Sequence, residues 1–336
     1  MSPALEGAGG EGPALGGAGG MSPALEGAGG AGPELEVGPG PALEGVRSAG
    51  PALEVVRAGA LTTVQDAGRI GWAHLGVPRA GALDGPALRL ANRLVGNAPD
   101  AAVLETTVTG CAVRVTGARP VLAVVGGAGC RVTVDGRPVA WGAPVRVPPG
   151  AVLEAGPAVQ GLRGYLAFAG GLVPEPVLGS RSADLLSGLG PPVLREGDVL
   201  PLGPALSSLA PHADTVPWPG APAELVLPLY PGPRDGWFTE GALRTLTSAA
   251  YRVSERSNRI GLRTEGPALT RARDGELPSE GMVLGAVQVP PDGLPVVFLN
   301  DHPTTGGYPV VGVVAEAALA RAAQAVPGTP VRFVRA

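Results

Sequence analysis

The residues that could do chemistry gather in short glycine-rich segments, and the first of these spans residues 66–85. It holds Asp66, Arg69, His74 and Asp84. Carboxylates and imidazoles can transfer protons, and a guanidinium can bind an anion. Because ordering a loop costs about 1–2 kcal/mol per residue in backbone entropy, long ordered loops are usually functional. We therefore predict that this segment forms a site and that these four residues are candidate catalytic groups. The alternative is a structural loop whose charges only satisfy backbone groups.

Two further polar segments lie in the last third of the chain. Residues 257–263 have the sequence SNRIGLR, and residues 300–309 have the sequence NDHPTTGGYP. Arginine can form a two-pronged pair with a carboxylate or phosphate, threonine hydroxyls can donate hydrogen bonds, and glycines permit close approach to the backbone. Asp301 and Glu280 are added as candidate bases or ion ligands, although an aspartate beside an arginine is more often a structural ion pair. The candidate binding residues are Asn258, Arg259, Arg263, Gln288, Thr304, Thr305, Gly306, Gly307 and Tyr308.

Two other features have open interpretations. Residues 170–182 form a polar loop in which serines flank Arg181. Backbone N–H groups and the guanidinium could there hold a phosphate or a carboxylate, and a solvated turn is the equal alternative. His74 could shuttle protons near neutral pH. Its alternative is a histidine packed against Trp72 with both ring nitrogens satisfied.

Local signals place regular structure on both sides of the first loop. Alternation over Thr62–Gln65 predicts a strand. Pro86–Val95 is predicted to be a helix, because its apolar residues share one face and Asp84 is a suitable N-cap. Gly96-Asn97 supplies a left-handed stop. We expect this loop and the two later polar segments to meet at the rims of closed β-structures and to form a cleft for a small anion.

Most of the remaining chain consists of short strand-like runs between Gly, Pro or Asp-Gly, which favours a barrel or sandwich over βαβ units. Asp135-Gly136 is a strong hairpin signal. Val121–Gly129 superficially resembles a dinucleotide loop, but its glycines do not fit GxGxxG and no helix follows, so we predict a wide hairpin turn. Later helices are expected after Thr239 and near Glu316–Ala325. The predicted strands before the linker include Val103–Thr107, Ala112–Val115, Val121–Val125, Arg131–Val134, Val145–Val147, Val152–Glu154 and Tyr165–Ala169.

Composition divides the chain into a tail and two folded parts. Residues 1–50 repeat MSPALEGAGG and are rich in Gly and Pro, so we predict a disordered low-complexity tail. The proline-rich stretch Ala210–Glu224 is the expected linker. We therefore predict a β-rich domain at 51–212 and a β-barrel domain at 222–336.

Bulk composition excludes several classes of function. The chain has 336 residues, a net charge of −4 and a pI of about 5.5. We expect neither nucleic-acid nor membrane binding, and a cytoplasmic location. All 25 basic residues are arginine, so the chain offers no Schiff-base lysine, no Walker A lysine and no lysine to carry biotin. Cys111 and Cys130 form no CxxC and there are only three histidines, so no metal site is expected.

Many separate motifs, in order, carry a family resemblance. They are LTTVQDAGRIGWAHLGVPRAGALD, LANRLVGN, VLET, AGG with VLGSRS, EGDVL, PGPRDGWF, SNRIGLR, GMVLGAVQVPPDGLPVV and TTGGYPVVGVV. From Leu53 to the C-terminus the chain resembles the family of 5-oxoprolinase C-type subunits, also called the biotin-dependent carboxyltransferase family or allophanate hydrolase subunit 2. The resemblance excludes the first fifty residues.

The resemblance implies a cyclophilin-like fold, so the expected class is mainly β: two β-rich barrel-like domains, a few short helices and a disordered N-terminal tail. It implies a hydrolase subunit, inactive alone, of an ATP-dependent 5-oxoprolinase that opens 5-oxoproline to glutamate. The implied partners are a B-type sister subunit and an A-type subunit of the LamB/YcsF class, and the implied substrate is a small anionic lactam or amide. ATP would act in the complex. The alternatives are a biotin-dependent carboxyltransferase acting on urea or a related amide, and a regulatory antagonist of a kinase-inhibitor sister subunit.

Two departures from the family pattern bear on the substrate. The family loop P-x-S-G-A-x-D has Ala80 at its serine position, and the residue before TTGGY, usually Gln, is Pro303 beside His302. A hydroxyl and an amide donor are thereby lost, which puts the substrate in doubt. The positions that match the family are Asp66, Arg69, Asp84, Asn258, Arg259, Gln288, Thr304, Thr305 and Tyr308.

Overall fold

The computed structural model describes residues 50–205 and 216–336 apart from residue 276. All of these residues belong to one structural unit. The predicted disordered tail at 1–50 and the centre of the predicted linker therefore lie almost entirely outside the described residues. The proposed domain boundaries at 51–212 and 222–336 stay a prediction.

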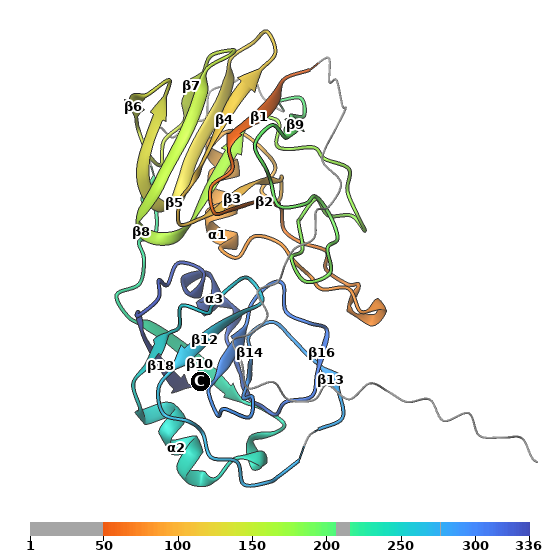
Figure 1. Ribbon diagram of the computed structural model, residues 1–336, viewed down its shortest axis with the longest axis vertical. Coiled ribbons are helices and arrows are strands. Elements are labelled where there is room, and N and C mark those ends of the chain that lie inside the picture. Colours follow the sequence, from red (N-terminus) through yellow and green to blue (C-terminus); the bar gives the residue numbers. More distant parts are fainter. Residues whose placement is uncertain (1–49, 206–215, 276) are drawn as a thin grey trace, which may run out of the picture. The chain divides into compact units, whose positions relative to one another are not determined.

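The first part of the chain forms a nine-stranded sheet with the order β2-β3-β8-β4-β1-β9, to which β5 joins through β8 and carries β6 and β7 (Figure 1). Every pairing in this sheet is antiparallel. The strands are β1 (Ala52–Arg57), β2 (Leu61–Gln65), β3 (Val103–Thr107), β4 (Cys111–Thr116), β5 (Val121–Val134), β6 (Arg137–Val139), β7 (Val145–Val147), β8 (Val152–Phe168) and β9 (Val199–Pro201).

β5 and β8 correct one prediction. Val121–Gly129 is not a hairpin turn, because it lies within β5 and pairs along β8 with register shifts after Gly127 and Gly129. Gly127 has a φ of 79°, and a Cβ there would lie 2.6 Å from the Arg163 carbonyl oxygen. The glycines thus serve a bulge in a long strand rather than a turn. The predicted Asp135-Gly136 hairpin is confirmed, with both residues at positive φ between β5 and β6.

The helix predicted after the first loop is confirmed as α1 (Gly85–Leu94). The Asp84 side chain accepts a hydrogen bond from the Ala87 N–H at 3.0 Å, which satisfies one of the free N–H groups at the helix start. The apolar face of α1 packs against the sheet in a cluster that includes Leu88, Leu94 and Val124. This packing fixes the far end of the 66–85 loop.

The last part of the chain forms a closed barrel in the order β10-β17-β14-β15-β12-β11-β18 (Figure 1). Alternate residues such as Leu225, Leu227 and Leu229 point into its core, as the twofold period of a strand requires. Its strands are β10 (Leu225–Pro231), β11 (Tyr251–Val253), β12 (Gly261–Glu265), β14 (Ala286–Gln288), β15 (Val296–Phe298), β17 (Val310–Val314) and β18 (Pro330–Arg335). The predicted mainly-β, barrel-like fold class is confirmed.

Short elements complete this part. α2 (Glu240–Ser248) is capped by Thr239 as predicted, and α3 (Glu316–Ala322) covers the barrel. A separate two-stranded ribbon pairs β13 (Glu280–Gly281) with β16 (Thr305–Gly306). None of the helices in the described ranges has the length and apolar character needed to cross a bilayer.

Candidate functional site

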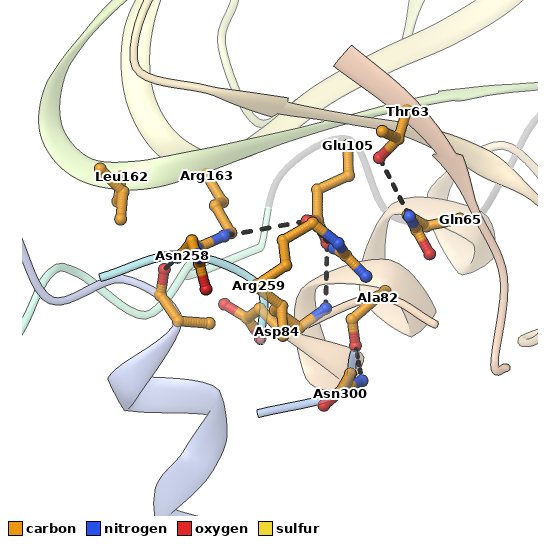
Figure 2. A network of polar contacts seen from close by, with 12 residues as sticks. Thr63, Gln65, Ala82, Asp84, Glu105, Leu162, Arg163, Asn258, Arg259 and Asn300 are labelled. Carbon is orange, nitrogen blue, oxygen red and sulfur yellow. Dashed lines mark hydrogen bonds and ion pairs between the residues drawn. The ribbon is translucent and has the colours of Figure 1, made fainter. Parts of the chain in front are cut away.

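A buried arginine joins the barrel to the nine-stranded sheet. Arg259, just before β12, is 1% exposed. Its Nε and Nη2 donate to the two carboxylate oxygens of Asp301, each at 2.9 Å. Its Nη1 donates to Glu105 on β3 (Figure 2). Nη2 also donates to the Gly81 carbonyl at 2.8 Å, within the 66–85 loop. The predicted carboxylate fork is present, but the carboxylate belongs to the chain itself.

The charges around Arg259 compensate one another. Burial alone would lower the pKa of Arg259, but Asp301 and Glu105 outweigh it and hold that pKa above its ordinary value. Burial raises the pKa of Asp301 against the opposing pull of Arg259. Arg163 on β8 adds a second cation, with its Nε 3.8 Å from a Glu105 oxygen. Two arginines thus face two carboxylates. Removing one member of such a buried group lowers the free energy of unfolding by more than the whole group contributes to it, because a buried charge is left without a partner.

Hydrogen bonds extend this network to the start of α1. The Tyr165 hydroxyl donates to Glu105 at 2.8 Å and accepts from the Asp84 N–H at 2.8 Å. Gln324, after α3, donates to Asp84 Oδ2 and to the Arg163 carbonyl, each at 3.0 Å. Its own side-chain oxygen accepts from the Leu162 and Arg163 N–H groups, each at 3.1 Å. Burial raises the pKa of Asp84. Asp84, predicted as catalytic, therefore caps α1 and binds the barrel side of the network.

Asp66 ties the first loop to the serine loop around Arg181. Its Oδ1 accepts hydrogen bonds from the Ser180 and Ser182 hydroxyls, each at 2.6 Å, and from the Gly68 N–H at 2.8 Å. Its Oδ2 accepts from the Arg181 N–H at 2.6 Å. The serine loop does hold a carboxylate, as one of its two interpretations expected, and that carboxylate is Asp66.

Arg69 reinforces the same junction. Its Nε donates to the Val177 carbonyl at 3.1 Å and its Nη2 donates to the Ser182 carbonyl at 2.5 Å. Burial lowers the pKa of Arg69, with nearby carboxylates opposing that effect. For Asp66 and Arg69 this geometry favours the structural alternative, in which the charges satisfy groups of the chain.

A cavity of about 420 Å³ opens beside this junction. One wall comes from the 66–85 loop and the first turn of α1, and the other comes from the barrel side through Leu284, Asn300 and residues 316–320. Asn300 donates to the carbonyls of Gly81 and Ala82, at 3.3 and 2.9 Å, and so holds the two walls together (Figure 2). Two arginines that the sequence reasoning did not single out, Arg79 and Arg89, line this cavity.

His302 is a buried histidine two residues after Asn300. It is 6% exposed and its ring stacks on Phe298 with centroids 5.7 Å apart. Its Nδ1 lies 2.7 Å from the Pro303 carbonyl oxygen, which assigns the proton to Nδ1 and leaves a lone pair on Nε2. Burial lowers the pKa of His302, and the charge of Arg79 lowers it further. His302 is therefore neutral near pH 7 and able to accept a proton.

The Thr-Thr-Gly-Gly turn does not join the cluster around Arg259. Gln288 donates to the Tyr308 carbonyl at 3.2 Å, the Thr304 carbonyl accepts from the Met282 N–H at 2.9 Å, and Gly306 pairs with Glu280. Beneath this ribbon lies a small apolar cluster: Met282, Ala286, Val296, Phe298 and Val310. Of the three segments expected to meet, the structure brings together the 66–85 loop and the Arg259 turn with Asp301. Thr304, Thr305, Gly306, Gly307 and Tyr308 form a separate ribbon.

Three further candidates also lie apart. Asn258 is exposed, and its side-chain oxygen accepts from the N–H groups of Ile260 and Gly261 as a turn cap. Arg263 is exposed on β12. His74 lies on an exposed turn, stacked on Trp72, with its Nδ1 3.0 Å from the Gly71 carbonyl oxygen. His74 does not line the cavity, so the structure gives no support to its catalytic assignment.

Several residues that build the site were missed: Glu105, Arg163, Gln324, Arg79 and Arg89. A charge inside an otherwise apolar strand was an available signal for Glu105 in VLET and for Arg163 in GLRGYLAF. Among the described residues, no cluster of His, Cys, Asp and Glu could hold a metal ion.

Comparisons with known proteins identify a matching family model, similar proteins and a similar solved structure. Residues 75–335 match the family model described as carboxyltransferase domain, subdomain A and B. The C-type subunit of the Escherichia coli 5-oxoprolinase is 38% identical over 281 residues, which cover 82% of this chain and 88% of that protein. The urea amidolyase of Lachancea kluyveri is 35% identical, but the match covers only 16% of that protein. In the crystal structure of TTHA0988, the matched chain is 40% identical in sequence and superimposes with a TM-score of 0.75. The match covers 84% of this chain and 56% of that one.

Proposed function

The chain belongs to the carboxyltransferase domain (subdomain A and B) family, and on that premise we propose that it is a subunit of an ATP-dependent 5-oxoprolinase. One observation carries this proposal: the similarity to the C-type subunit of 5-oxoprolinase extends over most of both chains. The similarity to urea amidolyase corresponds to a small part of a much longer protein. The corresponding 5-oxoprolinase subunit of Haemophilus influenzae, 32% identical over 87% of its length, points the same way.

The chemistry of lactam opening fits the groups around the cavity. Amide resonance makes 5-oxoproline a poor electrophile, so transfer of the γ-phosphoryl group of ATP to its carbonyl oxygen, with release of ADP, activates the carbonyl carbon. Water then adds to that carbon, the C–N bond breaks as the ring nitrogen takes a proton, and a second water hydrolyses the resulting acyl phosphate to glutamate and inorganic phosphate. Such a reaction needs cations for the phosphate and the substrate, and donors aimed at the developing oxyanion. Arg79 and Arg89 line one cavity of suitable size for a small acid and supply guanidinium donors there.

The name of the relatives implies partner subunits. We propose that this chain is inactive alone and works in the cytoplasm with a B-type sister subunit and an A-type subunit of the LamB/YcsF class. In this proposal ATP binds in the assembled complex. No biotin is attached to this chain, because it contains no lysine.

The test is reconstitution from the three purified subunits of one organism. Glutamate release from 5-oxoproline should require ATP and should fall to background when this chain is omitted. A variant at the exposed residue Arg263, Arg263→Gln, should restore as much activity as the unaltered chain. Glutamate release at the same rate with and without this chain would overturn the proposal.

The similarity to urea amidolyase supports one alternative, carboxyl transfer to urea or a related amide. Here the biotin would reside on another protein. Incubating the chain with a carboxylated biotin carrier and urea distinguishes the two functions. Urea-dependent loss of the carboxyl group from the carrier, with no turnover of 5-oxoproline in the reconstituted complex, would select the alternative.

A further inference from the structure

Arg79 is a partly buried cation whose guanidinium has no hydrogen-bond partner among the described residues. Its side chain is 28% exposed, and its Nε is buried and makes no hydrogen bond. Its nearest opposite charge is Glu316, 3.6 Å from Nη1, and that side chain is 76% exposed. No residue in the described ranges accepts a hydrogen bond from this guanidinium. Native proteins rarely leave buried donors unpaired, so such a group calls for an explanation.

The backbone around Arg79 is firmly held even though its side chain is free. The Arg79 carbonyl accepts from the Arg69 N–H at 2.6 Å, and the next residue, Ala80, donates from its N–H to the Asn300 carbonyl at 3.1 Å. Ala80 is fully buried at a φ of 49°, a conformation that only surrounding contacts can maintain in a residue with a Cβ. The guanidinium is therefore presented from a rigid base, which lowers the entropic cost of binding a ligand.

Arg89 adds a second free cation to the same cavity. It lies one turn into α1, is exposed, and forms neither a hydrogen bond nor an ion pair within the described part of the chain. A Cβ added at Gly85 would lie 3.1 Å from its Nη1, so the guanidinium folds back over the start of the helix. There it lies at the positive end of the helix dipole, which also favours an anion.

The acidic residues of the cavity do not neutralise these cations. Asp66 accepts four hydrogen bonds from the serine loop and its own turn. Glu316 contributes little to holding Arg79, because an exposed ion pair at this distance is weak and easily displaced. Asp100 is exposed and has no ion-pair partner among the described residues. The cavity therefore contains two available guanidinium groups. Its remaining carboxylates are Asp100, which is exposed, and Glu316, which is only weakly paired with Arg79.

We propose that this cavity is a carboxylate-binding site in which Arg79 and Arg89 hold the carboxylate of the small cyclic amide, so that the site selects an acidic lactam over an uncharged amide. Identifying the carboxylate as that of the lactam rests on the proposed function; the site itself rests on the free arginines. A guanidinium can bind both oxygens of a carboxylate at once, and an uncharged amide offers neither the charge nor the second oxygen. Urea and 2-pyrrolidinone should therefore bind poorly.

The test measures binding to the full-length chain by isothermal titration calorimetry with 5-oxoproline, 2-pyrrolidinone and inorganic phosphate. The unaltered chain should bind 5-oxoproline saturably and 2-pyrrolidinone at least about tenfold more weakly, the loss expected when a charged hydrogen-bonded pair is removed. Arg79→Gln and Arg89→Gln should each weaken 5-oxoproline binding, with Arg79→Gln losing about tenfold or more. Arg93→Gln, one turn further along α1 and exposed outside the cavity lining, is the matched control and should bind normally.

Three results would overturn the assignment. They are absence of saturable 5-oxoproline binding, equal binding of 2-pyrrolidinone, and normal binding by Arg79→Gln with an unchanged thermal unfolding curve. If phosphate displaces 5-oxoproline at a lower concentration than 5-oxoproline needs for its own binding, the cavity is a phosphate site instead. Selective binding together with an inactive reconstituted complex would keep the site and reject the enzyme function. If the reconstituted complex is active but Arg79→Gln binds 5-oxoproline normally, the enzyme function is kept and the carboxylate site is rejected.

Discussion

Arg259 donates to the backbone of the 66–85 loop and Arg79 belongs to that loop, but Arg259 is fully paired within the chain, whereas the Arg79 guanidinium has only a weak, exposed ion pair among the described residues. Arg259 binds both oxygens of Asp301, Glu105 and the Gly81 carbonyl. Arg79 makes no hydrogen bond from its guanidinium in the described part of the chain and lines a cavity. The difference separates a charge that holds the fold together from a charge that is available to a ligand.

The comparison also separates two kinds of loop residue. The buried group around Arg259 and the group around Asp66 fix the loop to the barrel and to the serine loop. The cavity walls are then rigid enough to present Arg79 and Arg89. The structural charges are thus a precondition for the free ones, and substitutions on either side of that division should have different consequences.

The largest effect should come from Arg259→Met. The change leaves Asp301 and Glu105 buried without their main partner, so we expect a loss of about 3–5 kcal/mol in the free energy of unfolding. Urea denaturation measures this loss. The matched control is Arg263→Met, at an exposed position on β12, which should change stability by no more than about 0.5 kcal/mol. If Arg259→Met costs less than about 1 kcal/mol, the buried network is not what joins the barrel to the sheet.

A smaller loss is expected from Asp66→Ala. Removing this carboxylate leaves the Ser180 and Ser182 hydroxyls and two backbone N–H groups without their acceptor, which should cost about 2–3 kcal/mol. Asp100→Ala removes an exposed carboxylate from the same cavity and should leave the denaturation midpoint nearly unchanged. Equal effects of the two changes would place Asp66 among the free charges of the cavity instead.

A still smaller effect should appear at His302. Burial lowers the pKa of its imidazole and the Arg79 charge lowers it further, so Arg79→Gln should raise this pKa toward the ordinary value. The native imidazole binds its proton more weakly than the unfolded one. The free energy of unfolding therefore falls as the pH drops from about 6.5 through the lowered native-state pKa. Arg79→Gln should bring the native-state and unfolded-state pKa values closer together, so this loss of stability should be smaller. NMR titration of the His302 ring measures the shift. A pKa that stays the same or falls would show that Arg79 and His302 do not share one site.

Local signals were enough to predict the elements that bracket the loop. Asp84 before Pro86 predicted the start of α1, and the Asp135-Gly136 pair predicted a hairpin, because both depend on neighbours in sequence. The glycine run in β5 misled because its pairing with β8, which lies far along the chain, outweighs the local preference for a turn.

The sequence predicted which segments come together at the site better than it predicted what their side chains do there. The 66–85 loop and the Arg259 turn do meet, yet Asp66 pairs with serines more than a hundred positions away, and Arg259 takes Asp301 instead of a ligand. Arg79 lies within the first family motif, but nothing in the motif distinguishes it from Arg69. Whether an arginine is committed or free depends on acceptors brought near by the fold, and sequence spacing does not reveal them.

The most direct test follows the arginine side-chain Nε–Hε resonances of uniformly labelled protein as 5-oxoproline is added. The Arg79 resonance, identified by its loss in Arg79→Gln, should shift saturably, and the Arg259 resonance should stay in place because all its partners lie within the chain. A stationary Arg79 resonance at saturating ligand, or equal shifts at both arginines, would contradict the division between a structural and an available charge.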